Sequence, residues 1–446
     1  MSLRISELLA ALSHALDLTE GQPVGHAERT CLIALRVADG LDLGDEDRHA
    51  LVMASLLKDV GCSSSAARMC RLFGTDDITL KANGKLVDWQ RPADVVRYTA
   101  RHVEGDSRLA RARRTIAVLR ELSDAGSEIV EARCDRGASI VRALGCPDAA
   151  AEAVYQLDEH WNGKGNPRRR TGAEIVPLAR IVALAQSVDV FNAVRGRAAA
   201  REMVRERSGR WYEPQVAAAF LQIADDDRLW DDLQRESLAE LVRDLDPPEL
   251  DRVADEAALD RVCEAFADVI DAKSPFTARH SRGVAAYALL MGQTLGLECD
   301  ELRDIRRAGL LHDIGKLGVP NSILDKPAKL TDEEFATMRL HPRFTEEILR
   351  GVEAFASFAE MAAAHHERMD GRGYHRGVRA GDLSRSARAL AVADVFEAVT
   401  ADRPYRAPMA PEAALEIMRR DVGQHLCPTT LEALEDGLSE AVQRAA

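Results

Sequence analysis

The stretch LLHDIGKLGVP, residues 310–320, has three titratable side chains where a predicted helix ends. Leucines at helical spacing run into His312 and Asp313, and Lys316 follows before a Gly-Val-Pro sequence that stops the helix. A second stretch, LLKDVGCSS (56–64), has the same form, with a lysine in place of the histidine and Cys62 in place of Lys316. This likeness predicts that the chain contains one kind of domain twice.

The likeness extends along the chain. Residues 17–59 align without a gap with residues 271–313. After an insertion in the first copy, further matches follow in the same order: EHWNGKGNP (159–167) with ERMDGRGYH (367–375), and SVDVFNAV (187–194) with VADVFEAV (392–399). Between the copies, Pro247 and Pro248 cannot occupy a helix interior. We therefore expect two tandem domains, residues 1–245 and 246–446.

The composition favours an all-α fold. Apolar residues recur three and four positions apart through most of the chain, and aromatic residues are only 4% of it, so the core is expected to be aliphatic. The net charge of −14 argues against a nucleic-acid polymer as a partner. No apolar run is long enough for a membrane span, and the eight cysteines form no CxxC pair, which favours a reducing cytoplasm.

Histidines and aspartates are concentrated in the second half. The set comprises His280, His312, Asp313, His341, His365, His366 and Asp394. A lone histidine on an apolar face is usually a core residue, but imidazoles and carboxylates from several helices together suit a borderline transition metal such as iron, manganese or zinc. The second half is therefore predicted to hold a metal centre.

The order of these motifs resembles that of the HD-GYP phosphodiesterases, a branch of the HD-domain metal phosphohydrolases. The resemblance runs from SPFTARHS (274–281) through LLHDIGKLGVP, RLHPRFTEEIL, HHERMDGRGY and ADVFEAVTADRPYR to GQHLCP (423–428). It implies an all-helical fold, a metal centre, and hydrolysis of the bacterial messenger cyclic di-GMP to pGpG or onward to GMP. The first half is expected to be a degenerate copy.

Carried over position by position, the resemblance also implies residue roles. Two divalent transition metals are expected, iron or manganese first, with zinc, nickel and magnesium as alternatives. One metal would be held by His280, His312, Asp313 and Asp394, and the other by Asp313, His341, His365 and His366. Lys316 and Asp313 are the expected catalytic residues. The expected substrate-binding residues are Gly373, Tyr374, Glu397, Arg403 and Arg406.

Four positions depart from the family pattern. Phe276 stands where some relatives have a glutamate for a third metal, so two metals are expected. His375 replaces the proline of the Gly-Tyr-Pro signature, Glu397 replaces an aspartate, and Thr345 replaces a glycine. These changes bear on substrate identity and rate more than on metal binding.

The first copy keeps His26, Asp59 and Asp189 but has lost the other ligands. The replacements are Lys58, Arg133, Leu157 and Asp158, with Cys62 in place of the lysine. Lysine and arginine offer positive charge instead of a lone pair, so they can pair with Asp59 and Asp189 but cannot bind a metal. We expect residues 1–245 to form a metal-free domain that supports, dimerises or regulates the second half.

Alternative functions remain open at this point. The second half could act on another nucleotide or cyclic dinucleotide, or serve as a non-catalytic receptor that signals through the first half. A di-iron oxygenase is a further alternative, against which Arg403 and Arg406 argue because guanidinium groups suit a phosphate substrate.

Overall fold

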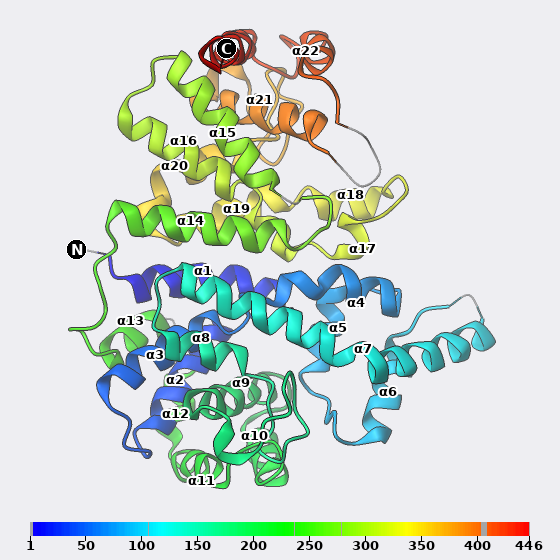
Figure 1. The fold of residues 1–446 in the computed structure, drawn as a ribbon, viewed down its shortest axis with the longest axis vertical. Coiled ribbons are helices and arrows are strands. Elements are labelled where there is room, and N and C mark those ends of the chain that lie inside the picture. Colours follow the sequence, from blue (N-terminus) through cyan, green and yellow to red (C-terminus); the bar gives the residue numbers. More distant parts are fainter. Residues whose placement is uncertain (1–2, 106, 236, 278, 403–407, 446) are drawn as a thin grey trace. The chain divides into compact units, whose positions relative to one another are not determined.

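The computed structural model describes residues 3–105, 107–235, 237–277, 279–402 and 408–445. These residues form helices and turns, with isolated β-bridges and no strand among them, so the predicted all-α class is confirmed (Figure 1). The contacts divide the chain into two compact units, Met1–Ala258 with Pro320–Ser322, and Leu259–Val319 with Ile323–Ala446. Each unit is described by itself below.

The helices of the first half follow one another with short connections. Along the chain they are α1 (Ile5–Thr19), α2 (His26–Ala38), α3 (Asp45–Leu57), the 3-10 turn η1 (Cys62–Ser65), α4 (Ala66–Phe73), α5 (Asp77–Gly84), α6 (Pro92–His102), α7 (Arg108–Ala143), α8 (Asp148–Tyr155), η2 (Gly172–Glu174), α9 (Pro177–Arg195), α10 (Arg197–Arg207), α11 (Pro214–Ile223), α12 (Asp227–Asp232) and α13 (Leu238–Leu245).

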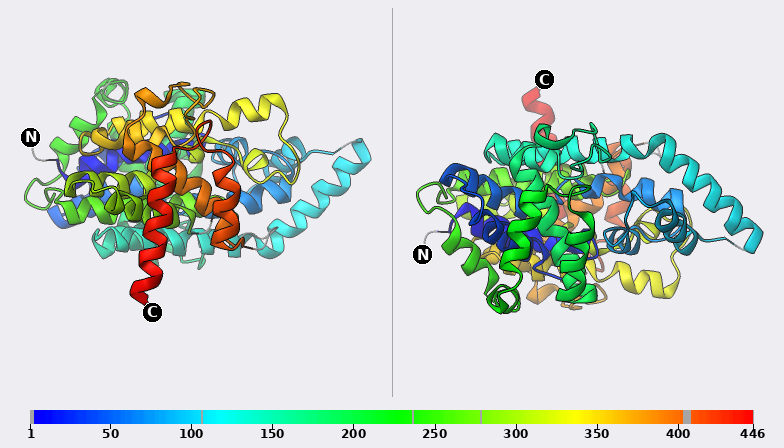
Figure 2. Two further views of the ribbon diagram at one scale, coloured as in Figure 1. Left: turned by 90° about the horizontal axis from the view of Figure 1, so that it is seen from above. Right: turned by 90° about the horizontal axis from the view of Figure 1, so that it is seen from below.

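The second half repeats much of this series. Its helices are α14 (Glu256–Asp271), α15 (His280–Thr294), α16 (Cys299–Leu311), η3 (Ile314–Gly318), α17 (Asn321–Leu324), α18 (Asp332–Met338), α19 (His341–Arg350), η4 (Glu353–Phe355), α20 (Ala356–Ala363), η5 (Ala380–Asp382), α21 (Arg385–Thr400), α22 (Pro411–Arg419) and α23 (Pro428–Ala445). Helix α23 extends past the other helices of its unit (Figure 2).

Equivalent helices pack in the same way in both units. In the first unit α2 packs against α3 and α9, and in the second unit the matching helix α15 packs against α16 and α21. The inward faces are aliphatic: Leu32 and Leu35 of α2 are fully buried, as are Val284 and Ala288 of α15. Burying such side chains is the main stabilising contribution to an all-helical core. The predicted pair of tandem helical domains is therefore confirmed.

Matching polar contacts support the duplication residue by residue. Glu159 is buried, and its two carboxylate oxygens accept hydrogen bonds from the backbone N–H groups of Arg168 and Arg170. Glu367, its counterpart, accepts from the N–H groups of Arg376, Gly377 and Val378 in the equivalent loop. A buried carboxylate thus holds the same loop in each unit.

A glycine allows a close helix contact in each unit. A Cβ on Gly61 would lie 2.2 Å from the carbonyl oxygen of Arg133, and one on Gly315 would lie 2.0 Å from that of His341. Both distances are far inside van der Waals contact, so only glycine fits. In the second unit this contact brings η3, which follows α16, against the start of α19.

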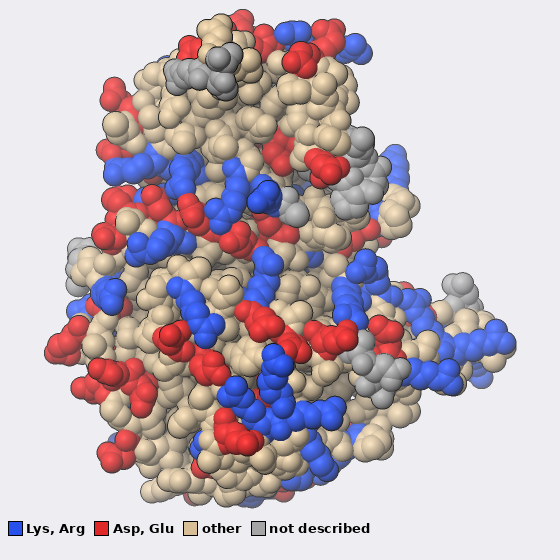
Figure 3. Space-filling model, in the orientation of Figure 1, with Lys and Arg blue, Asp and Glu red and all other residues tan. Residues whose placement is uncertain are grey.

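The insertion in the first half forms its own small core. Helices α4–α6 and the first half of α7 surround the buried side chains of Phe73, Leu80, Tyr98, Val103 and Val118. The first turns of α7 extend away from the other helices of the unit (Figures 1 and 2). Exposed arginines line this segment (Figure 3).

The glycine contact generates a stability prediction. Gly61→Ala should lower the midpoint of thermal unfolding by about 5 °C or more, because the added methyl group must displace backbone atoms, at a cost of about 2 kcal/mol. Gly126→Ala is the matched control, since an added Cβ on Gly126 in α7 meets nothing within 4 Å. It should leave the midpoint unchanged or raise it slightly. Equal midpoints for the two variants, measured by circular dichroism, would contradict the close contact.

Candidate metal centre

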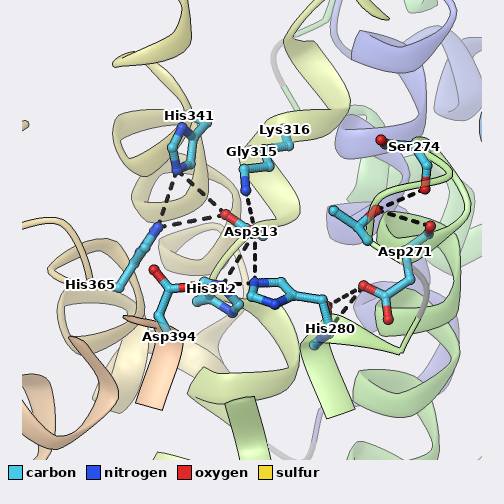
Figure 4. Close-up of polar contacts among 12 residues, drawn as sticks. Asp271, Ser274, His280, His312, Asp313, Gly315, Lys316, His341, His365 and Asp394 are labelled. Atoms are coloured by element: carbon cyan, nitrogen blue, oxygen red, sulfur yellow. Dashed lines mark hydrogen bonds and ion pairs between the residues drawn. The ribbon is translucent and has the colours of Figure 1, made fainter. Parts of the chain in front are cut away.

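Five segments of the second unit bring the predicted ligands together. His280 begins α15, His312 and Asp313 follow the last residue of α16, and His341 begins α19. His365 and His366 follow α20, and Asp394 lies within α21. The ligand positions therefore stand mostly at helix ends, where the backbone can turn a side chain toward the interior (Figure 4).

Asp313 lies at the middle of the cluster and is almost fully buried. Its Oδ2 atom is 3.3 Å from Nε2 of His312 and 3.6 Å from Nε2 of His280. Its Oδ1 atom is 3.4 Å from Nε2 of His341 and 3.6 Å from Nε2 of His365. The two carboxylate oxygens thus face different pairs of histidines, which is the arrangement a bridging ligand needs.

The remaining ligands complete two neighbouring groups. Asp394 Oδ1 is 3.3 Å from His280 Nε2 and 3.9 Å from His312 Nε2. Ligand atoms of His280, His312 and Asp394 all lie within 4.8 Å of one another, and so do those of His341, His365 and His366. All the metal ligands proposed from the sequence are therefore brought within reach of two adjacent positions.

Backbone hydrogen bonds fix the orientation of three of the histidine rings. The Nδ1 atoms of His312, His341 and His365 lie 2.9, 2.7 and 2.7 Å from the carbonyl oxygen of the residue three positions earlier. Donation from Nδ1–H leaves the lone pair on Nε2, which faces Asp313 in each case. The tautomer that a metal requires is thus set by the backbone.

Burial and local charge set the protonation states. Burial lowers the pKa of His341 and of His366 to about 3, so both imidazoles are neutral near pH 7. Burial alone would raise the pKa of Asp313, but the Lys316 ammonium and His312 hold it well below its usual range. His341 and His366 therefore present neutral nitrogen donors beside the ionised Asp313. Burial would lower the pKa of His280, but its contacts with Asp394 and Glu397 raise it to about 10.

The donor set fits divalent cations. The Nε2 atom of His312 and the Oδ1 atom of Asp313 are buried without a hydrogen-bond partner among the described residues. Such atoms are costly to bury unless a ligand satisfies them. Imidazole and carboxylate donors suit borderline transition metals, and the grouping suits two of them.

Lys316 and Tyr374 stand beside the ligands. The Nζ atom of Lys316 is 2.5 Å from Asp313 Oδ2, and its side chain is 22% exposed, so it reaches both the centre and solvent. The Tyr374 ring lies 4.8 Å from the ring of His366, and the guanidinium of Arg339 lies 5.0 Å from the Tyr374 ring. Arg339 was not among the sequence-predicted site residues, and no motif pointed to it.

The other predicted substrate contacts have different surroundings. A Cβ on Gly373 would lie 2.5 Å from the Cα atom of Glu367, so the glycine allows close packing of the loop that carries Tyr374. Glu397 is buried against Nδ1 of His280. Arg403 and Arg406 lie outside the described residues. Glu367, which organises this loop, was missed, although its match to Glu159 in the repeat was a signal for it.

The equivalent region of the first unit is filled by positive side chains. Lys58 pairs with Asp59, and Lys85 Nζ lies 3.2 Å from Asp59 Oδ1 and 3.1 Å from Glu20 Oε2. Burial would raise the pKa of Asp59, but the two ammonium groups hold it far below its usual range. Glu20, Asp59 and Cys62 are close enough to hold an ion, yet lysines already neutralise the carboxylates.

The expected pairing with the retained aspartates holds for Lys58 and Asp59 but not for Arg133, which pairs with Asp158. Asp189 is paired with His26 and Arg29 instead. Lys85 was not predicted, because it comes from the insertion and has no counterpart in the second copy.

None of the helices within the described ranges is both long and apolar enough to cross a membrane.

Comparison with known proteins identifies the family. The chain matches the family model described as HD domain over residues 113–216 and 264–430. It is 39% identical over 436 residues to a 3′3′-cGAMP-specific phosphodiesterase 3 of Vibrio cholerae, covering 98% of this chain and 95% of the relative. A cyclic di-GMP phosphodiesterase response regulator of Xanthomonas campestris is 37% identical over 180 residues, which are 40% of this chain and 48% of the relative.

A solved structure gives the same result for the fold. The crystal structure of a cyclic GMP-AMP-specific phosphodiesterase of Vibrio cholerae has a TM-score of 0.67 and 35% identity, and the match covers 98% of each chain. The HD-domain matches fall in both halves, and the likeness to named phosphodiesterases extends over the whole length. The chain therefore belongs to the HD-domain family and, within it, to the HD-GYP phosphodiesterases.

Proposed function

We propose that the second unit hydrolyses a phosphodiester bond of a cyclic dinucleotide, with 3′3′-cGAMP as the first candidate substrate and cyclic di-GMP as the second. The observation that carries the reaction type is the convergence of imidazoles on the two oxygens of Asp313, with Lys316 2.5 Å away. The ranking of substrates rests on the relative that matches the whole chain, whose name specifies 3′3′-cGAMP. The named cyclic di-GMP phosphodiesterases match less than half of this chain.

We infer that the centre holds two divalent transition metals, iron or manganese first, with zinc, nickel and magnesium as alternatives. When bound, such a pair acidifies a water molecule and polarises the phosphodiester. The proposed ligands of the first metal are His280, His312, Asp313 and Asp394, and those of the second are Asp313, His341, His365 and His366.

The chain's own residues carry the remaining tasks. Lys316 pairs with Asp313 on one side and is partly exposed on the other, so its ammonium can donate to a phosphate oxygen or protonate the leaving oxygen. The Tyr374 ring, backed by Arg339, offers a stacking face for a base. Arg403 and Arg406 remain candidates for the second phosphate because guanidinium groups bind phosphate with two hydrogen bonds.

A non-catalytic receptor is the weaker alternative. A receptor needs phosphate and base contacts, but it gains nothing from buried neutral imidazoles with their lone pairs directed at a carboxylate. The first unit fits a supporting or regulatory role without metal, because Lys58 and Lys85 already neutralise Asp59.

The substrate ranking is tested by turnover. Purified protein loaded with manganese or iron should hydrolyse 3′3′-cGAMP with a kcat/KM at least about tenfold above that for cyclic di-GMP, a difference of about 1.4 kcal/mol in transition-state binding. Chromatography of the products provides the measurement, and Asp313→Asn is the inactive control. A higher value for cyclic di-GMP would reverse the ranking, and binding without turnover would favour a receptor.

The metal stoichiometry separates the two units. Elemental analysis of the full chain should find two transition metals, and Asp313→Asn should lose both because Asp313 faces both groups of ligands. Asp59→Asn, the equivalent change in the first unit, should keep both metals. Four metals in the unmodified chain, or loss of metal from a folded Asp59→Asn variant, would contradict a metal-free first unit.

Lys316 is tested apart from metal binding. Lys316→Met should keep both metals and lower kcat by about 10²- to 10³-fold, because a donor to the reacting phosphate is lost. Arg303→Ala, which removes an exposed cation paired with Asp300 near the start of α16, should change kcat by less than about twofold. An unchanged kcat in Lys316→Met would remove this lysine from the reaction.

A further inference from the structure

We propose that Glu397 and Gly283 act as a pair that positions His280 for metal binding, and that the first unit has exchanged this pair for Asn192 and Arg29. The inference rests on the proposed metal centre. It gives Glu397 a role beyond the substrate contact suggested by the sequence, because its buried carboxylate contacts a ligand imidazole.

His280 does not use the backbone contact that orients the other rings. For His312, His341 and His365, Nδ1 bonds to the carbonyl of the residue three positions earlier. For His280 that residue is Thr277, whose carbonyl oxygen already accepts the backbone N–H of His280 at 3.0 Å. The Nδ1 atom is bonded instead to the Glu397 carboxylate, which reaches it from α21.

Gly283 provides the space for that carboxylate. A Cβ at position 283 would lie 2.7 Å from Cγ and 3.2 Å from Oε1 of Glu397. Any larger residue would therefore push the glutamate away from His280. Glu397 and His280 are both buried, so no bulk water is available to replace the contact.

The first unit shows the consequence of lacking this pair. The alignment of the copies sets Arg29 against Gly283 and Asn192 against Glu397. There, Nδ1 of His26 bonds to Asp189 Oδ2 at 2.7 Å, and Nε of Arg29 donates to Asp189 Oδ1 at 2.8 Å. Both oxygens of Asp189, the counterpart of Asp394, are therefore occupied.

In the second unit Glu397 takes the contact with Nδ1 of the histidine, so that Asp394 does not have to make it. Because Nδ1 of His280 is bonded to Glu397, its Nε2 atom faces Asp394 at 3.3 Å and Asp313 at 3.6 Å. A carboxylate behind a ligand histidine fixes its tautomer and increases its basicity, and losing such a partner typically weakens metal affinity by about 10- to 100-fold. Glu397 is accordingly a positioning residue for the first metal.

The test measures metal affinity in the full-length protein with manganese as the probe. Glu397→Ala should weaken binding of one of the two manganese ions by about 10- to 100-fold and leave the other unchanged. Glu397→Asp should recover part of the affinity. Gly283→Ala should weaken the same ion through displacement of the glutamate, which tests the contact from the opposite side if Glu397→Ala folds poorly. Glu416→Ala, an exposed glutamate on α22, should leave both affinities unchanged.

Steady-state kinetics distinguish positioning from substrate contact. At saturating manganese, the KM of Glu397→Ala for the cyclic dinucleotide that the wild type hydrolyses should stay within about twofold of the wild-type value. Unchanged manganese affinity, or a raised KM with both ions fully bound, would overturn the positioning role. If the wild-type chain itself binds no manganese, the proposed metal centre fails and this inference fails with it. If the wild type binds two ions and the Glu397 variants bind both with unchanged affinity, this inference fails but the proposed metal centre stands.

Discussion

A buried carboxylate must be compensated by positive charge or by hydrogen-bond donors, and each unit of this chain is organised around one such carboxylate. Asp313 and its counterpart Asp59 follow equivalent helices, α16 and α3, and are almost inaccessible to solvent. An ionised carboxylate left unpaired in such an interior costs on the order of several kcal/mol. The side chains around each aspartate are therefore constrained by the need to compensate it, whatever else they do.

The two units satisfy this constraint differently on one scaffold. The two units share matching local contacts. A glycine makes the same close approach in each, at Gly61 and Gly315, and a buried carboxylate holds the same loop, from Glu159 and Glu367. Around Asp59 the charge comes from lysine ammonium groups, which are permanently attached. Around Asp313 there is one ammonium group, that of Lys316, and the other neighbours are imidazoles whose nitrogens can bind exchangeable cations. One backbone thus supports either a salt-bridged core or a metal centre.

The sequence predicted the helical class, the duplication and the set of residues that meet around Asp313, because these depend on local periodicity and on motifs with fixed spacing. It could not predict Lys85, which reaches Asp59 from an insertion with no counterpart to align. It assigned Glu397 to the substrate from its position in a motif. The contact with His280 arises only when α21 packs against α15, and neither segment alone predicts that packing. The bases of the substrate could not be predicted either, because their recognition depends on which side chains touch the ligand.

The first unit has Arg29 and Asn192 where the second has Gly283 and Glu397, so no single substitution gives it the surroundings of His280. Restoring a histidine at position 58 would return one ligand, but the guanidinium of Arg29 would still hold the aspartate that must bind the ion. Replacing Lys58 or Arg29 singly would remove the positive charge that compensates Asp59 or Asp189, and so would destabilise the fold. Building a copy of the second centre in the first unit would therefore need several substitutions at once.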